Sequence, residues 1–574
     1  MTRRHRQRAL AAVLVVGLVQ AVVIGARGQR DPSPFRTFHT FDVTLARTVK
    51  VMRGEAWARS LPVGELIPPT WYGMGPPQMW AVVPGNAPDA AKMYKRQQPL
   101  FFLLAGALPA ATGLGPLSLR LGPLALLWGL AGLLAWTAHR LAGPRALVAA
   151  GVLMLLVPAG WQTAMMALPG LGMMLGAALV TAGTVASDRL RSPVGAALVG
   201  LAVAVAAWMG ESAGDTVQVL AVTLPTVVLG GLWGAVSKGS ALQRVRAVVG
   251  AGLALGVARV LIDVPWILRH TQGYLLSEAT GGGRPPDPFA FLHTVPTALL
   301  GNLVDGYLET LAWSLLTPAG AAVVALGLVA GLFTRHRLAM VWALGGPAAL
   351  LVLLSMPEKT GDYYALVAVP GIVLAAAVGL SSLRRWGLVV LAAGSVATSV
   401  VLGTVAHLDL PPVKAAICQP SGGLWLLQDP LACASRDPHP RIRPTMRIAR
   451  KIPGSVETRR TAVAQWLAGI EMVKVWPQIP PGSVIWIIGG NQSPVDTAEV
   501  SVLTQRADLL PRTLQGQAHN WRARPDLQGT EEWVFLLGDV RSGSTVPPKW
   551  PAYIGDLQDF GGTGDIRVGR LTPR

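Results

Sequence analysis

Long apolar runs repeat through the first 406 residues, and they constrain the fold more than any other feature of the sequence. They are rich in Leu, Val, Ala and Gly and nearly free of charge, and they include residues 121–138, 146–158, 194–209, 217–236 and 386–403. A helix needs about 20 apolar residues to cross the hydrocarbon core of a bilayer. Only 14% of all residues are charged, against about 25% in soluble proteins. The pattern predicts a polytopic α-helical membrane protein with about eleven spans.

Basic turns alternate with neutral or acidic turns between the apolar runs, and this alternation predicts the orientation. The basic turns carry Arg140 and Arg145, Arg189 and Arg191, Lys238, Arg244 and Arg246, Arg335 and Arg337, and Arg384 and Arg385. Positive residues favour the cytoplasmic side, so a multi-pass protein of the plasma (inner) membrane is expected, with a cytoplasmic N-terminus. Much of the net charge of +19 lies in these turns. No nucleic-acid motif is visible, and we expect no nucleic-acid partner.

Residues 99–118 break the alternation if they are counted as a span, because the Arg140 turn would then lie outside. The apolar run 99–113 is only about 15 residues long, short for a span, and it contains Pro109 and Gly113. We expect a juxtamembrane or re-entrant helix on the outer side that breaks at these two residues. With about eleven spans, the C-terminal residues 407–574 then lie outside.

The C-terminal region is polar and rich in Pro, unlike the membrane part. Residues 483–488 and 533–537 are typical of strands, and residues 455–475 and 498–507 of helices. We therefore divide the chain into a transmembrane domain, 1–406, and a small extracytoplasmic α/β domain, 407–574.

Both cysteines, Cys418 and Cys433, lie in this outer region. An oxidising compartment favours a disulfide between them, although free thiols stay an open alternative. No further Cys or His lies at ligand spacing from them, so we expect no metal site and no cofactor.

Charged residues near the outer membrane face are candidates for function, because such groups are costly there unless they are used. The first outer loop, 27–120, is longer than an ordinary connection. Asp42 follows the first span and opens an amphipathic stretch suited to the membrane surface. Lys95 and Arg96 stand near the far end of the same loop.

Three motifs carry a resemblance to a known family. In the first, an acid leads into an Ala-Arg helix that ends at Gly. In the second, a helix that starts with Pro-Leu-aromatic is followed by Gly and, later, by Arg. In the third, a late outer turn reads Lys-x-x-x-Tyr-Tyr before a span that contains Pro. The matching residues are Asp42, Ala46, Arg47 and Gly54; Pro99, Leu100, Phe101, Gly115 and Arg120; and Lys359, Tyr363, Tyr364 and Pro370. In this order and spacing, the chain resembles the GT-C membrane glycosyltransferases, especially the aminoarabinose-transferase and protein O-mannosyltransferase branch.

The resemblance implies a hexosyl- or pentosyltransferase that moves a sugar, with inversion, from a polyprenyl-phosphate donor to an extracytoplasmic glycan, lipid or protein acceptor. Membrane lipid is the other expected partner. Asp42 would be the catalytic base. The residues expected to bind substrate or phosphate are Lys359, Arg96, Lys95, Tyr363, Tyr364 and Arg269. Each has a plainer interpretation: Asp42 as a solvated or helix-capping acid, Lys359 as a lipid-headgroup contact, and the tyrosines as part of an aromatic belt.

The sequence departs from the family pattern at several positions: Arg96-Gln97 replaces Glu-Lys, Gln98 replaces a Pro, and one acid is missing. Gly170 stands where a second acid is expected, and Glu55 and Glu211 are the candidates to replace it. A non-catalytic GT-C-like protein that binds glycans or partners is therefore the main alternative function. A transporter of lipid or solute is a weaker alternative, because charges inside the apolar runs are almost absent.

The topology predicts that Gly115 lies on the outer side. In a background with Cys418→Ser and Cys433→Ser, Gly115→Cys should react with a membrane-impermeant maleimide in intact cells. Thr334→Cys, beside the basic Arg335 turn, is the matched control and should react only in inverted vesicles. Labelling of the Gly115 variant from the cytoplasmic side alone would contradict the topology.

Overall fold

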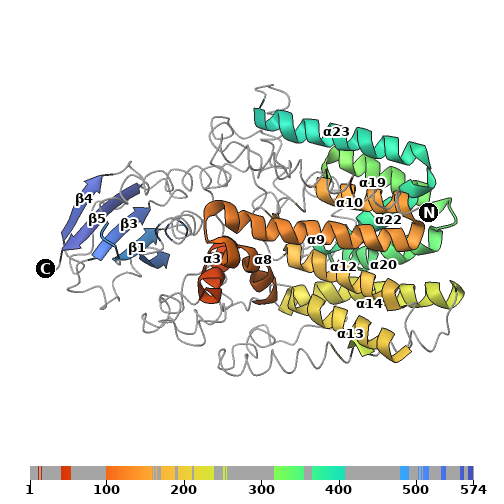
Figure 1. The fold of residues 1–574 in the computed structure, drawn as a ribbon, viewed down its shortest axis with the longest axis horizontal. Helices are drawn as coiled ribbons and strands as arrows, with labels where there is room; N and C mark the ends of the chain where they lie inside the picture. Colours follow the sequence, from red (N-terminus) through yellow and green to blue (C-terminus); the bar gives the residue numbers. More distant parts are fainter. Residues whose placement is uncertain are drawn as a thin grey trace. The chain divides into compact units, whose positions relative to one another are not determined.

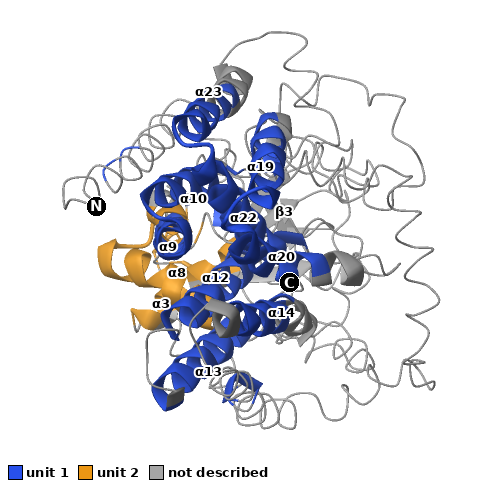
Figure 2. Cartoon of the chain, turned by 90° about the vertical axis from the view of Figure 1, so that its right-hand side faces the viewer, with its two compact units in different colours: residues 1–26, 124–428, 439–453 blue, residues 27–123, 429–438, 454–574 orange. Residues whose placement is uncertain are grey.

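The structure, a computed structural model, describes a subset of the chain (Figure 1). The described residues are 40–53, 99–157, 170–187, 192–209, 213–237, 316–354, 365–407, 483–489, 509–515, 532–537, 556–561 and 566–572, with isolated residues between these ranges. The chain forms two compact units (Figure 2): unit 1 holds residues 1–26, 124–428 and 439–453, and unit 2 holds residues 27–123, 429–438 and 454–574. The domain boundary at 406/407 stays a prediction.

Unit 1 is built from apolar helices. They are most of α9 (Pro116–Ala142), then α10 (Pro144–Leu156), α12 (Gly170–Ser187), α13 (Ser192–Trp208), α14 (Ala213–Ser237), α19 (Thr317–Leu332), α20 (Arg337–Leu354), α22 (Val369–Ser382, preceded by the 3-10 turn η2, Leu366–Ala368) and α23 (Arg385–His407). Gly143, at φ +90°, ends α9, and Pro144 starts α10. Gly after a helix and Pro at the start of the next are the residues preferred at these positions.

Two helices in the described part of the chain are long and apolar enough to cross a bilayer, Ser118–Ala142 and Gly170–Ser187. Within the other described helices of unit 1, the apolar stretches are 10–17 residues long, such as Pro193–Trp208 and Val222–Trp233. The number of about eleven spans stays a prediction.

Helix α22 lies at the centre of unit 1 (Figure 2). Helices α10, α12, α19, α20 and α23 all contact it. Its residues from Val373 to Leu380 are buried without interruption. A helix buried on all sides must be apolar all round, which explains why its sequence lacks an amphipathic pattern.

Glycines let the backbones of these helices approach closely. A Cβ on Gly379 of α22 would collide with the carbonyl oxygen of Gly327 in α19, and one on Gly371 would lie 2.6 Å from the carbonyl oxygen of Ala343 in α20. Between α14 and α20, Gly346 meets the Val222 carbonyl in the same way. Small residues at helix interfaces are characteristic of membrane helix packing, where dispersion contacts replace the hydrophobic effect between helices.

In unit 2, helix α3 (Thr40–Met52) packs against helix α8 (Pro99–Thr112). One face of α8 is buried and carries Phe101, Phe102 and Ala105, whereas the other exposes the apolar side chains of Leu103 and Leu104. The 14 residues of α8 span about 21 Å, less than the roughly 30 Å of a hydrocarbon core. An exposed apolar face on a short helix fits the expected juxtamembrane placement.

The expectation that this helix breaks at Pro109 is wrong, because α8 continues through Pro109 to Thr112. Pro109 has no N–H to donate to the carbonyl of Ala105, four residues earlier. The Ala105 carbonyl instead faces Gly122 of α9, where an added Cβ would collide with its oxygen. A neighbouring helix that approaches the released carbonyl is one way in which apolar helices tolerate Pro. The expected break at Gly113 is present, at φ +106°.

A five-stranded sheet also belongs to unit 2. Its strands are β1 (Val484–Gly489), β2 (Leu510–Gln515), β3 (Glu532–Leu537), β4 (Asp556–Gly561) and β5 (Ile566–Thr572), in the spatial order β2-β1-β3-β5-β4. β1 is parallel to both β2 and β3, and β5 is antiparallel to β3 and β4. The strands expected at 483–488 and 533–537 are β1 and β3. In the predicted helix 498–507, Val502 and Thr504 are helical and Arg506 is not, while its other residues lie outside the described part of the chain. The predicted helix 455–475 lies outside it entirely.

The glycine contacts predict a specific loss of stability. Gly379→Ala should lower the free energy of unfolding by about 1–3 kcal/mol, because a backbone carbonyl cannot move aside as a side chain can. Gly129→Ala in α9 is the matched control: no atom lies within 4 Å of its added Cβ, so the better helix propensity should leave stability equal or raise it by about 0.5–1 kcal/mol. Unfolding in detergent followed by circular dichroism measures both, and equal effects would contradict the packing argument.

Candidate functional site

Asp42 and Arg120 form a buried ion pair in unit 2. The Arg120 Nη1 donates a hydrogen bond of 2.6 Å to the Asp42 Oδ1. Relative exposure is 0% for the Asp42 side chain and 1% for that of Arg120. Asp42 stands in the first turn of α3, and Arg120 is the fifth residue of α9, 78 positions later in the chain. The pair therefore joins two helices that are distant in sequence.

The start of α9 fixes where Arg120 points. Pro116 begins the helix, and the Ser118 hydroxyl both accepts a hydrogen bond of 2.8 Å from the Gly115 N–H and donates one of 3.0 Å to the Gly115 carbonyl. These bonds tie the entering chain to the first turn of α9. Leu119 next to Arg120 is fully buried, so this turn faces the interior of the protein.

Helix α8 completes a frame around the ion pair. Gly106 of α8 lies against α3, where an added Cβ would be 3.3 Å from Val49 Cγ2. On its other side, α8 meets α9 through the contact between Ala105 and Gly122. Helices α3, α8 and the start of α9 are thus held by two glycine contacts and one ion pair, and we call this set the α3–α8–α9 frame.

Helix α3 buries polar residues as well as apolar ones. Thr48 and Lys50 are each 1% exposed, and the apolar Leu45 and Val49 are fully buried. The alternative that Asp42 is a solvated acid is therefore wrong, whereas the membrane-surface position of α3 stays a prediction. The buried charges of α3 are enclosed by protein, where they cost free energy unless they serve structure or chemistry.

The other predicted site residues lie outside the described part of the chain, so their positions stay predictions. They are Lys359, Arg96, Lys95, Tyr363, Tyr364, Arg269, Glu55, Glu211, Cys418 and Cys433. Gly170, which stands where the family has an acid, is buried and begins α12. The described residues contain no cluster of three or more His, Cys, Asp or Glu that could hold a metal ion.

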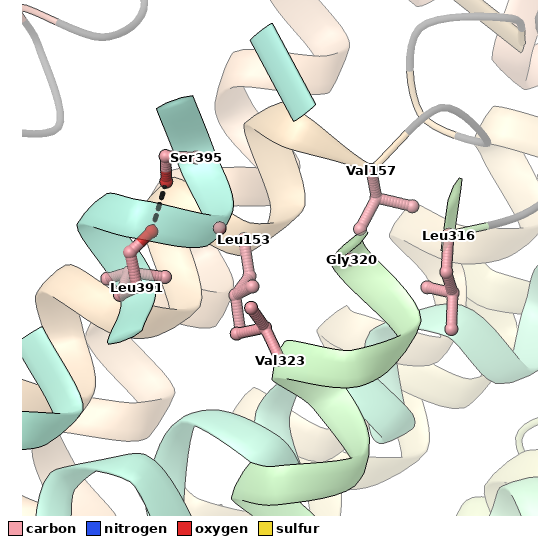
Figure 3. Close-up of a pocket in the computed structure, with 8 residues that line it drawn as sticks. Leu153, Val157, Leu316, Gly320, Val323, Leu391 and Ser395 are labelled. Carbon is pink, nitrogen blue, oxygen red and sulfur yellow. Dashed lines mark hydrogen bonds between the residues drawn. The ribbon is translucent and has the colours of Figure 1, made fainter. Parts of the chain in front are cut away.

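A pocket lies between helices α10, α19 and α23 of unit 1 (Figure 3). Its lining residues are Leu153, Val157, Leu316, Gly320, Val323, Leu391, Gly394 and Ser395. The Ser395 hydroxyl donates to the Leu391 carbonyl at 2.6 Å, so the single polar side chain of the lining is already used by the backbone. This pocket has room for no more than about one water molecule and offers no catalytic group.

The turn between α19 and α20 carries a histidine, His336, whose pKa is lowered. Burial and, second, the Arg335 guanidinium lower the pKa of His336. The Arg335 Nε donates to the His336 Nε2 at 3.2 Å, which requires the neutral ring. The basic residues of this turn predict a cytoplasmic position for it, away from the expected outer site.

Arg120 is the site residue to which the sequence analysis gave no role. It matched a family motif, but no partner was inferred for it. The available signal was physical: an Arg five residues into an apolar helix needs a carboxylate or a route to water. Asp42 has the same need for an oppositely charged partner or water, because it is an acid that lies close to a span.

The ion pair predicts strong coupling between the two positions. Asp42→Ala and Arg120→Ala should each lower the free energy of unfolding by about 3–5 kcal/mol, because each leaves an opposite charge buried. The double variant should lose much less stability than the sum of the two single losses. The difference, obtained from the double-mutant cycle, measures the interaction energy of the pair. Arg140→Ala, at an exposed position in the last turn of α9, is the control and should change stability little. Additive losses would contradict the pairing.

The comparisons with known proteins bear on the fold. No protein-family profile and no curated protein sequence matches the chain. Among solved structures, ArnT from Cupriavidus metallidurans in the apo state is 15% identical over 99% of this chain and 100% of that chain, with a TM-score of 0.49. The same protein bound to undecaprenyl phosphate is 15% identical over 99% of both chains, with a TM-score of 0.52. An Archaeoglobus fulgidus oligosaccharyltransferase is 13% identical over 93% of this chain and 73% of that chain, with a TM-score of 0.33.

Of these three, the lipid-bound ArnT structure has a TM-score above 0.5, and its match extends over nearly the whole of both chains. At 15% identity the likeness shows the fold and not the activity. The chain therefore has the polytopic helical fold of the GT-C membrane glycosyltransferases.

Proposed function

We propose that the protein is a membrane glycosyltransferase that moves a hexose or pentose from a polyprenyl-phosphate donor to an extracytoplasmic glycan, lipid or protein. The observation that carries the proposal is the buried Asp42–Arg120 pair in a chain of GT-C fold. A carboxylate is costly to bury, so a buried carboxylate is a candidate for a functional role.

The proposed reaction is a single inverting displacement. The acceptor hydroxyl attacks the anomeric carbon of the sugar, and a new glycosidic bond forms. The bond between that carbon and the phosphate oxygen of the lipid breaks, and the oxygen keeps the electron pair. Asp42 takes the hydroxyl proton as the general base. Cations beside the phosphate stabilise the charge that develops on the leaving group; the residues proposed for this role are Lys359, Arg96, Lys95 and Arg269, with Tyr363 and Tyr364 as further contacts.

A lipid donor is supported by the comparison with solved structures. A structure of the same fold, ArnT, has been solved with undecaprenyl phosphate bound. The apolar pocket between α10, α19 and α23 adds no support, because it has room for no more than about one water molecule.

Access to Asp42 is a requirement of this mechanism. Its side chain has no exposed surface, so an acceptor hydroxyl reaches it only when the segments that cover α3 move. Rearrangements of loops that enclose the substrate are common in enzymes that exclude water from the reaction. The proposal therefore includes a conformational step before transfer.

The same burial favours a second candidate, a GT-C-like protein without catalysis that binds a glycan or a partner. In that case Asp42 and Arg120 only join α3 to α9. The buried Gly170 at the start of α12, where the family has an acid, also favours this candidate. The two candidates differ in whether Asp42 is needed for turnover in a folded protein.

Asp42→Asn separates them. The substitution keeps the size of the side chain and removes the base, so the rate of sugar transfer should fall by about 10²–10⁴-fold. The measurement uses purified protein in liposomes, polyprenyl-phosphate [¹⁴C]sugars of the hexose and pentose classes, and an envelope fraction as the acceptor. Label in the acceptor fraction gives the rate.

Binding of undecaprenyl phosphate, followed by the shift in unfolding midpoint, is measured in parallel as a control. The Asn variant should bind the lipid as the wild type does, because the base does not hold the phosphate. Transfer at the wild-type rate by Asp42→Asn would refute the role of Asp42. Lipid binding without transfer by the wild type, with every donor and with the envelope fraction, would favour the non-catalytic candidate.

A further inference from the structure

The Arg120 guanidinium is placed to do more than neutralise a charge. It approaches Asp42 through one nitrogen at 2.6 Å, in a site where neither side chain reaches solvent. Hydrogen bonds between ionised groups are short and strong, and they fix the direction of the acceptor oxygen. The carboxylate oxygen Oδ1 is therefore held in one position relative to α9.

The surrounding backbone is rigid for a separate reason. The Ala105–Gly122 contact sets the distance between α8 and α9, and the contact at Gly106 sets that between α8 and α3. The distance between α8 and α9 cannot shrink, because Gly122 lies against the backbone of Ala105, whereas Gly106 lies against side chains of α3 such as Val49. Close packing resists expansion at both places. Arg120 stands two residues before Gly122 on α9, so the frame fixes the position of its backbone.

From this arrangement, and resting on the proposed function, we infer that Arg120 is the positioning residue of the transfer reaction. Arg120 does not touch the substrate; it acts through Asp42. It holds the Asp42 carboxylate in a single orientation before the acceptor arrives. Loss of about 1 Å in the placement of a catalytic group can cost about 10²-fold in rate.

The proton balance agrees with this role. Asp42 takes one proton from the acceptor hydroxyl, the leaving lipid phosphate takes the electron pair, and Arg120 keeps its own proton throughout. The protonated Asp42 passes its proton to water before the next turnover.

A purely structural pair would behave differently from a positioning pair. If Arg120 only joins the helices, any cation that restores stability also restores turnover. If Arg120 orients the base, a cation of different shape restores stability but not the rate. Lys carries the same charge but lacks the planar fork of Arg, so Arg120→Lys separates the two roles.

The experiment compares Arg120→Lys and Arg120→Gln with the wild type in the liposome transfer assay. Unfolding midpoints and undecaprenyl phosphate binding are measured on the same samples. Arg140→Gln, an exposed Arg on the same helix, is the matched control and should keep the wild-type kcat. Arg120→Gln should lower kcat by about 10²-fold with the KM for the lipid donor unchanged. Arg120→Lys should recover most of the stability, while kcat stays at least about tenfold below the wild type.

Two results would overturn the inference. One is an Arg120→Lys variant whose kcat returns with its stability, since this outcome marks a structural pair. The other is a folded Arg120→Gln variant with the wild-type kcat. If Arg120→Gln does not fold, the Lys variant decides alone. Failure of the proposed function is distinct: Asp42→Asn would then turn over at the wild-type rate, whatever the Arg120 variants do.

Discussion

The transfer of a carboxylate and a guanidinium from water into a protein interior is the most expensive event in the described part of this chain. Each ion loses several kcal/mol of solvation, and this loss is offset only when the partner is present at hydrogen-bond distance. The 2.6 Å contact between Arg120 and Asp42 meets that condition. The pair therefore stabilises the packing of α3 against the start of α9.

The backbone contacts around α8 depend on the same constraint. The ion pair requires α3 and α9 to approach from two sides of α8, and glycines at positions 106 and 122 permit the approach. Pro109 contributes as well, because it frees the carbonyl of Ala105 that Gly122 meets. A side chain larger than hydrogen at Gly122 would push α9 away from α8 and with it Arg120 from Asp42. In unit 1 the same device, a glycine against a carbonyl, sets the spacing of α22 from α19 and α20.

Much of the fold was predictable because its signals are local. Strands β1 and β3 follow from short runs of Val, Ile, Trp, Phe and Leu, and the short helix α8 follows from an apolar run that stops at Gly113. The break at Pro109 was predicted wrongly, because the effect of a proline depends on whether a neighbouring helix meets the released carbonyl. That neighbour, α9, is a tertiary contact, and no local pattern contains it.

The candidate site also has a part that the sequence predicted and a part that depends on tertiary contacts. The sequence by itself determined that Asp42 is an unusual acid, since it stands beside an apolar run where a charge is costly, and it determined the polytopic helical class through the length and number of apolar runs. Only the tertiary structure decided that Asp42 is buried and that Arg120 is its partner. The physical reason is distance along the chain: 78 residues separate the two, and a pairing energy between residues so far apart arises only after the intervening helices have packed.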